Sequence, residues 1–193
     1  MKPVLVLYAT REGHTHRVAE HLAAVVRAHG LSAETVDSGH IPEGFSLDNY
    51  CLAIVSASVH GGKHEPEVAG FVKNHLADLE RMPTAFLSVS LSEAKAENVA
   101  APPEVRATAA AEVEKMIEVF LKETGWHPGR IKAVAGALMF TKYNFLMRFV
   151  MKRIARNAGA DTDTSKDHVY TNWDALAQLV DELARAIPAD TAA

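Results

Sequence analysis

The sequence predicts an α/β fold in which helices cover both faces of a doubly wound parallel sheet. Short continuous apolar runs recur along the chain, as expected of strands that are buried on both faces. Apolar residues at helical spacing follow most of these runs. Because each parallel crossover needs a helix, this alternation indicates a parallel sheet. At 193 residues the chain can bury one sizeable core, and we expect a single domain over residues 1–193.

Five segments are predicted as strands, namely 4–8, 33–37, 51–57, 84–90 and 131–138. The segment 33–37 is the weakest and is predicted to lie near a sheet edge. Helices are predicted over 15–29, 66–79 and 104–123, and from the N-cap Asn172 onward. Ligands of such sheets bind outside the carboxyl ends of the strands. The loops 10–15, 58–64 and 90–99 are therefore expected to form the site.

Composition narrows the class of protein. The chain is 48% hydrophobic and 23% charged, which is typical of a soluble globular protein. A net charge of −4 gives no reason to expect a nucleic-acid partner. The one cysteine, Cys51, excludes an internal disulfide and fits a reducing compartment. No signal peptide or membrane-spanning run is recognised, so we expect a cytoplasmic protein.

A phosphate site is one interpretation of the loop between the first strand and the first helix. Hydroxyls at Thr10 and Thr15 and the flexible backbone at Gly13 face the helix N-terminus, where unpaired amides and the helix dipole favour an anion. The loop lacks the Gly-x-Gly-x-x-Gly dinucleotide pattern, and residues 61–63 do not form a Walker A loop. By pattern alone, phosphate binding and an ordinary capped turn remain equally open.

The segment Thr-Arg-Glu-Gly-His-Thr (10–15) resembles the Thr-x-x-Gly-x-Thr loop that binds the FMN phosphate in flavodoxins, at the same place after the first strand. Other stretches resemble the menaquinone-dependent protoporphyrinogen IX dehydrogenases, flavodoxin-like enzymes of bacterial haem synthesis. They include Ser-Ala-Ser-Val-His (56–60), Ala-Gly-Ala-Leu (135–138), Asp-Thr-Asp-Thr (161–164) and Val-Tyr-Thr-Asn-Trp (169–173). The resemblance implies FMN as cofactor, protoporphyrinogen IX as substrate and a membrane quinone as electron acceptor. A soluble electron carrier of the flavodoxin type, a general FMN-dependent quinone reductase and a module that has lost FMN are the alternatives.

The resemblance also implies which residues bind the cofactor. At the phosphate they are Thr10, Arg11, Glu12, Gly13, His14 and Thr15, with His14 expected to help neutralise the charge. Along one side of the isoalloxazine they are Ser58, Val59, His60, Gly61 and Gly62, and near its other side and rim Ser90, Leu91 and Ser92. His60 is the one candidate to stack on the ring, so one ring face is expected to stay open to a substrate.

No catalytic side chain is assigned from the sequence, because no nucleophile–base pair is recognised and a flavin carries its own chemistry. A metal is not expected either. His60 and His64 are separated by a Gly-Gly loop, and the segment 161–165 lacks the glycine that a calcium loop needs after it, having Lys166 instead.

A long basic insert, at about residues 139–168, follows the last predicted strand. Connections of this length are usually functional. Its cations are Lys142, Arg148, Lys152, Arg153 and Arg156, with no acidic residue between 139 and 160. Leu146, Phe149, Val150 and Ile154 form one apolar stripe on a helix.

Two interpretations of the insert stay open. It is either a cover over the sheet edge with a basic outer face or a basic amphipathic surface for lipid, quinone or an anionic substrate. The second interpretation predicts that the protein binds an anionic membrane surface. It also predicts a peripheral protein on the cytoplasmic face of the inner membrane. The residues expected at this substrate or membrane surface are Lys142, Tyr143, Arg148, Phe149, Lys152, Arg153 and Arg156. Because the three flavin loops lie elsewhere in the sequence, the insert is expected to be dispensable for FMN binding. A homo-oligomer is also left open.

Overall fold

Five parallel strands form the centre of the computed structural model, which describes residues 2–157 and 161–186. They are β1 (Val4–Ala9), β2 (Ala33–Asp37), β3 (Leu52–His60), β5 (Thr84–Ser90) and β6 (Arg130–Ala135). Their order in the sheet is β2-β1-β3-β5-β6, the order of a flavodoxin-like doubly wound sheet. The prediction of a five-stranded parallel sheet with 33–37 at an edge is confirmed.

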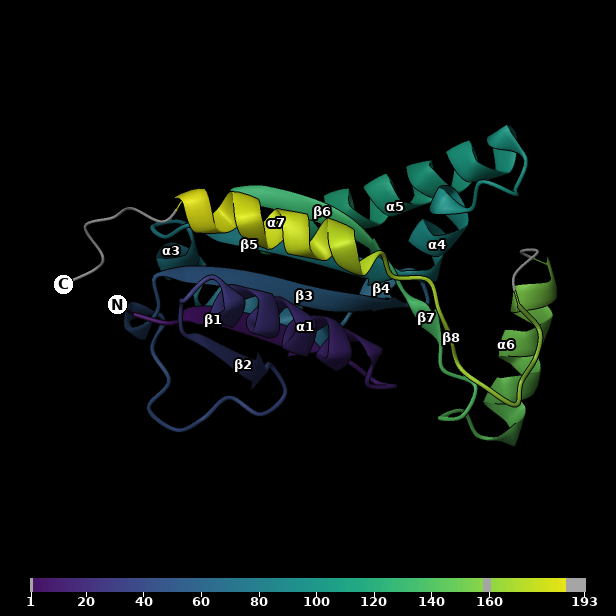
Figure 1. The fold of residues 1–193 in the computed structure, drawn as a ribbon, viewed down its shortest axis with the longest axis horizontal. Coiled ribbons are helices and arrows are strands. Elements are labelled where there is room, and N and C mark those ends of the chain that lie inside the picture. The colour runs from purple at the N-terminus through teal and green to yellow at the C-terminus, as the bar shows by residue number, and fades with distance from the viewer. Residues whose placement is uncertain (1, 158–160, 187–193) are drawn as a thin grey trace.

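Helices cover both faces of the sheet (Figure 1). On one face lie α1 (His14–Ala28) and α7 (Trp173–Ala186), and on the other α2 (Pro66–Asn74), α3 (Leu76–Leu79) and α5 (Pro103–Thr124). Alternate residues of each strand enter opposite cores, because side chains alternate across a strand. Val4, Val6 and Ile54 pack with α1 and α7, whereas Leu5, Leu7 and Val55 pack with α2 and α5. A 3₁₀ turn (Leu47–Asn49) precedes β3.

Two of the predicted boundaries around the site are wrong. Residues 90–99 were expected to be a loop, but Leu91–Glu97 form the helix α4. Its N-cap is Ser90, whose hydroxyl oxygen accepts a hydrogen bond from the Glu93 amide at 3.1 Å. The loop 58–64 is in fact a hairpin, because β3 continues to His60 and turns through Gly61 and Gly62 into β4 (Lys63–His64), which pairs with it antiparallel.

The strand predicted at 131–138 and the helix predicted at 66–79 are each interrupted. The strand breaks at Gly136, where a Cβ atom would lie 3.2 Å from the Ser90 carbonyl carbon and oxygen. Beyond the break, β7 (Ala137–Leu138) pairs antiparallel with β8 (His168–Val169) as a separate two-stranded ribbon. The helix divides into α2 and α3 at His75.

The insert leaves the body of the protein through this ribbon and forms the helix α6 (Phe145–Asn157). Figure 1 shows α6 standing apart from the sheet, beyond the carboxyl ends of its strands. Residues 158–160 of the insert lie outside the described part of the chain. A small core of Leu138, Phe140 and Ala155, with Met151 and Tyr170 packed against it, attaches α6 to the ribbon. The insert is thus positioned over the site rather than over a sheet edge.

Candidate cofactor and substrate site

The three loops selected from the sequence meet in one cleft of about 320 Å³ at the carboxyl ends of the strands. Of the predicted cofactor-binding residues, those that line it are Thr10, Arg11, Glu12, His14, Thr15, Ser58, Val59, His60, Gly61, Ser90 and Leu91. Gly62 and Ser92 line an adjoining hollow of about 430 Å³, which shares Val59, Gly61, Ser90 and Leu91 with the cleft. The cleft therefore continues past the hairpin turn.

The start of α1 provides an anion site at one end of the cleft. Gly13 is the N-cap with φ of 86°, and no side chain caps the helix or places an acid in its first turn. Thr10 turns inward, and its hydroxyl oxygen accepts a hydrogen bond from the Gly13 amide at 3.0 Å. Because amides in the first turn of a helix have no carbonyl partner within it, they are left to a ligand. A phosphate fits this corner.

His14 is buried beside the same corner, with 6% of its surface exposed. Its Nε2 lies 2.8 Å from the Thr171 hydroxyl, and that hydroxyl donates to the Ala135 carbonyl oxygen at 2.6 Å. The network therefore assigns the proton of His14 to Nε2 and leaves Nδ1 an acceptor, which is buried without a partner. Burial, and then the charge of Arg17, lower the pKa of His14 to about 4. This pKa does not support the expectation that His14 helps to neutralise the phosphate, and that role stays a prediction.

A buried carboxylate that sequence analysis missed braces the hairpin. Glu65, with 3% of its side chain exposed, accepts from the Arg11 Nε at 3.1 Å, and its Oε1 lies 3.1 Å from the Ser58 hydroxyl oxygen. Its amide donates to the Ser58 carbonyl oxygen at 3.1 Å. Arg11 is thus occupied by Glu65. No local sequence pattern could predict that Glu65 contacts Arg11, since the two residues are 54 positions apart in the sequence.

His60 lies at the edge of the cleft between two acids. Its Nε2 is 3.2 Å from Glu65 Oε1 and 3.3 Å from Glu12 Oε2. The ring lies where the flavin loops meet, with 28% of the side chain exposed, and its Nε2 makes no hydrogen bond to either carboxylate. Its placement in the cleft agrees with the sequence, and stacking on the ring stays a prediction.

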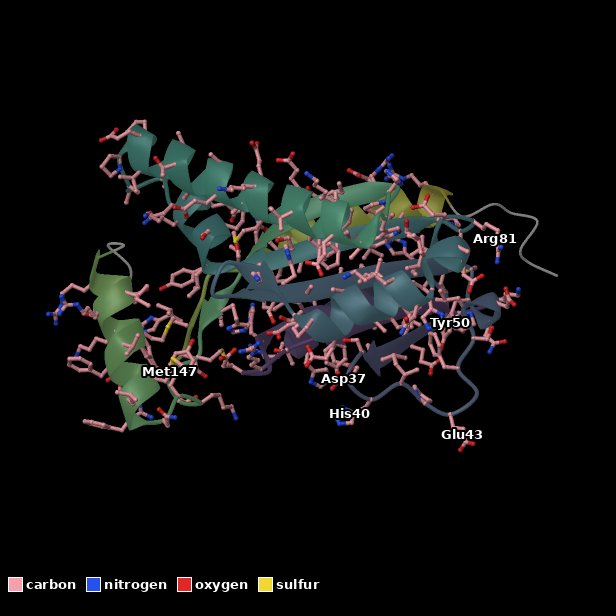
Figure 2. The ribbon with its side chains drawn as sticks, turned by 180° about the vertical axis from the view of Figure 1, so that it is seen from behind. Asp37, His40, Glu43, Tyr50, Arg81 and Met147 are labelled. Atoms are coloured by element: carbon pink, nitrogen blue, oxygen red, sulfur yellow. The ribbon has the colours of Figure 1, made fainter. Side chains whose placement is uncertain are left out.

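The insert supplies one wall of the cleft, although the three flavin loops lie elsewhere in the sequence. That FMN binds without the insert stays a prediction, and this wall argues against it. The lining residues it contributes are Met139, Tyr143, Met147, Met151 and Ile154. Figure 2 shows Met147 on the side of α6 that faces the strands. The periodicity of the insert could not reveal this, because it identifies an apolar stripe but not its partner.

The structure places the seven residues predicted at the substrate or membrane surface in different environments. Tyr143 lines the cleft. Arg148 is turned inward. Its Nε donates to the Phe140 carbonyl oxygen at 3.2 Å, and a terminal nitrogen donates to the Tyr143 carbonyl oxygen at 3.3 Å. Arg148 therefore does not belong to the outer face of α6. Lys152 is half-buried, whereas Lys142, Phe149, Arg153 and Arg156 are exposed.

Most of the apolar stripe on α6 faces solvent, and only Ile154 of its residues also lines the cleft. Leu146, Phe149, Val150 and Ile154 are 71%, 63%, 42% and 50% exposed, and Phe145 is 89% exposed. The described residues 2–157 and 161–186 contain no helix long and apolar enough to span a bilayer. An exposed apolar patch of this kind is typical of an interaction surface.

In the part of the chain that the structure describes, no group of three or more histidines, cysteines or acids is arranged to hold a metal ion. His64 points away from His60 into the core, where its Nε2 lies 2.9 Å from the Ser88 hydroxyl and burial lowers its pKa to about 4. In the segment tested as a calcium loop, Asp163 instead accepts from the amide and hydroxyl of Ser165.

The residues present fit FMN. Unpaired amides at the start of α1 suit its phosphate, the orphaned Nδ1 of His14 suits a hydroxyl of its ribityl chain, and the open turn at Gly61 and Gly62 lets backbone approach its ring. A cleft lined in this way, at the carboxyl ends of a sheet with the order β2-β1-β3-β5-β6, is typical of flavodoxin-like, FMN-binding domains, and it assigns the protein to that class.

Comparison with known proteins agrees with this class. A flavodoxin domain family matches residues 5–165, and FMN is its cofactor. The oxidised flavodoxin 1 of Bacillus cereus has the same fold, with a TM-score of 0.53 at 17% identity over 96% of this chain and 99% of that one. Protoporphyrinogen IX dehydrogenase (quinone) of Escherichia coli K12 is 34% identical over 93% of both chains. The enzyme of that name from Leishmania major is 31% identical over 95% of this chain and 75% of its own. The chain belongs to the flavodoxin domain family and, within it, to the family of protoporphyrinogen IX dehydrogenases (quinone).

Proposed function

We propose that this protein is an FMN-dependent dehydrogenase that oxidises protoporphyrinogen IX and passes the electrons to a membrane quinone. The observation that carries the proposal is the similarity to the E. coli enzyme over 93% of both chains, and a cleft whose lining residues fit FMN supports it. When bound, FMN supplies the ability to take up electrons from one substrate and give them to another.

The side chains of the protein position the reactants and handle protons. Glu65 holds Arg11 and Ser58, so the phosphate loop and the hairpin keep a fixed separation. Oxidation of a porphyrinogen breaks C–H and N–H bonds and releases protons. His60, which lines the cleft at its edge with 28% of its side chain exposed, is our candidate to accept one.

The outer face of α6 is proposed to attach the protein to an anionic membrane surface, at the cytoplasmic side where quinone is reached. Exposed apolar side chains of Phe145, Leu146 and Phe149 stand beside the exposed cations Arg153 and Arg156. Apolar insertion and attraction to anionic lipid act together in helices of this kind. A soluble carrier would have no use for such a face.

Anaerobic flavin spectroscopy tests the activity. Protein loaded with FMN should lose its visible flavin absorbance on addition of protoporphyrinogen IX and regain it on addition of a naphthoquinone. Protein that binds FMN but is not bleached by the tetrapyrrole would contradict the proposed substrate and leave a quinone reductase or an electron carrier. Protein that neither carries flavin nor quenches the fluorescence of added FMN would contradict all three.

A further inference from the structure

A second cavity, of about 790 Å³, lies between α4, β7 and α6, next to the cleft assigned to FMN. Its volume is in the range of small-molecule sites, about 300–1,000 Å³. Leu91 and Ile154 line both the cavity and the cleft, and Ser92 and Glu112 line both the cavity and the hollow beside the hairpin turn. A molecule in this cavity would therefore reach the edge of the flavin site through apolar contacts.

The charges around the cavity disfavour an anionic occupant. One cation, Lys95, faces three carboxylates, those of Glu97, Glu112 and Asp161. The carboxylates of a porphyrinogen would meet like charges there, which disfavours binding. A groove on the other side of the hairpin has the opposite balance, with Arg11, Lys63 and Lys73 against Glu123. Arg11 is paired with Glu65 and Lys73 with Glu123, so Lys63 is the cation that this groove offers to a carboxylate.

The surface inside the cavity suits a flat, uncharged ring. Leu91, Leu138, Ile154 and Ala155 provide apolar contacts, and Lys95 provides a donor. Burial, and then the charge of Asp161, raise the pKa of Tyr170 to about 12, so its hydroxyl keeps its proton. That hydroxyl donates to Asp161 Oδ2 at 3.2 Å, so Tyr170 contributes the face of its ring to the cavity rather than a donor. A quinone ring offers carbonyl acceptors to Lys95 and brings no charge of its own.

The wall formed by α6 leads from this cavity to the surface. Ile154 lines the cavity and is half exposed, and the neighbouring Val150 belongs to the apolar outer face of the same helix. An apolar tail on the ring could follow this face into lipid, whereas a free polar substrate would gain nothing from it.

We propose that the cavity between α4 and α6 binds the ring of the quinone, at a site separate from that of the tetrapyrrole. This inference rests on the proposed function. It assigns the acidic cavity to the uncharged substrate and directs the carboxylate-bearing substrate to the other side of the flavin cleft.

Filling the cavity tests the assignment. Ala94 lines it from α4 and is absent from the lining of the flavin cleft, so Ala94→Trp should occupy the space of the ring. Ala100→Trp, at an exposed turn residue outside the cavity lining, is the matched control. We expect Ala94→Trp to slow reoxidation of the reduced flavin by a naphthoquinone at least about tenfold, a loss of about 1.4 kcal/mol. Flavin reduction by protoporphyrinogen IX and the Kd for FMN should be unchanged, and the control should behave as wild type.

A binding measurement that does not depend on turnover accompanies the kinetics. An azidonaphthoquinone, photolysed with the oxidised wild-type protein, should label peptides containing residues 91–98 or 151–157, and excess unlabelled naphthoquinone should prevent this. Labelling confined to peptides of the groove lined by Lys63 and Lys73 would overturn the assignment, even if Ala94→Trp failed to fold. A smaller filler, Ala94→Leu, provides a second kinetic test.

The outcomes separate the two proposals. Slowed reduction by the tetrapyrrole with normal reoxidation by quinone would give the cavity to the tetrapyrrole and overturn the inference, as would normal rates in both steps. A different result would contradict the proposed function and support the quinone site. In that result protoporphyrinogen IX does not reduce the flavin of the wild-type protein, but quinone reoxidises the reduced flavin in a step that Ala94→Trp slows.

Discussion

Acid should weaken this protein through His64, whose imidazole is buried against Phe86 and Phe120 with ring centroids 5.3 and 4.9 Å away. Only 8% of the residue is exposed, and burial lowers the pKa from 6.5 to about 4. The folded state therefore binds fewer protons than the unfolded state. The stability contributed by the neutral ring is complete above the unfolded pKa of 6.5 and is lost as the pH falls from there toward 4.

The size of the effect follows from the two pKa values. Linkage between them lowers the free energy of unfolding by about 2 kcal/mol when the pH falls from about 8 to about 5. His14, with the same pKa of about 4, adds a loss of similar size. Together they remove about 4 kcal/mol, a large part of the roughly 5–15 kcal/mol that holds a domain folded.

Urea unfolding at saturating FMN, followed by circular dichroism across this pH range, measures the loss. His64→Gln keeps a polar group for Ser88 but does not titrate, so its loss should be smaller than that of wild type by about 2 kcal/mol. His40 has an 86% exposed side chain on an outer loop, seen in Figure 2, and His40→Gln is the control. If His64→Gln loses as much stability as wild type over the same range, the buried neutral imidazole is not the cause of acid sensitivity.

Three further predictions concern the site and the insert. Thr15→Ala should weaken FMN binding, measured by fluorescence titration, because a hydrogen bond to a charged phosphate contributes roughly 1.5–3 kcal/mol; unchanged affinity would contradict the assigned loop. Gly136→Ala should lower the free energy of unfolding by roughly 1–3 kcal/mol, since its Cβ would press on the Ser90 backbone. Gly70→Ala is the comparison, because no atom lies within 4 Å of the new Cβ, and it should stabilise α2 by up to about 1 kcal/mol. Equal effects at Gly70 and Gly136 would refute the explanation that the Gly136 Cβ presses on the Ser90 backbone. Reversing Lys152, Arg153 and Arg156 to Glu should abolish co-sedimentation with anionic vesicles while FMN stays bound. High salt should weaken vesicle binding of the wild-type protein only in part, because salt does not screen the contacts of the apolar side chains of α6.

The strands and the flavin loops could be predicted because their signals are local. A buried parallel strand such as β1 is apolar along its whole length, and the helix after it begins at His14, directly after the N-cap Gly13. The helix α4 was missed although its capping signature, Ser90 followed by Glu93, is also local. This acidic, alanine-rich segment has no apolar face that would indicate a helix, and none of α4 is fully buried.

What could not be predicted depends on contacts between distant segments. The break in the last strand follows from the approach of Gly136 to Ser90, 46 positions earlier in the sequence. The role of Glu65 depends on Arg11, and the neutral state of His14 depends on burial beside Thr171. Hydrophobic periodicity marked the stripe on α6 without showing whether it meets protein or solvent, because an exposed and a buried apolar face have the same pattern.

The ribbon of β7 and β8 joins the two ends of the insert. Ala137 is paired with Val169 and Leu138 with His168, so the chain leaves and re-enters the flavodoxin body at one point. Everything between can change in length or sequence while the five-stranded sheet and the phosphate corner keep their register. The insert is therefore an exchangeable unit. Grafting it between the corresponding positions of a simple flavodoxin would transfer a wall of the ring site and the proposed membrane-binding helix in one step.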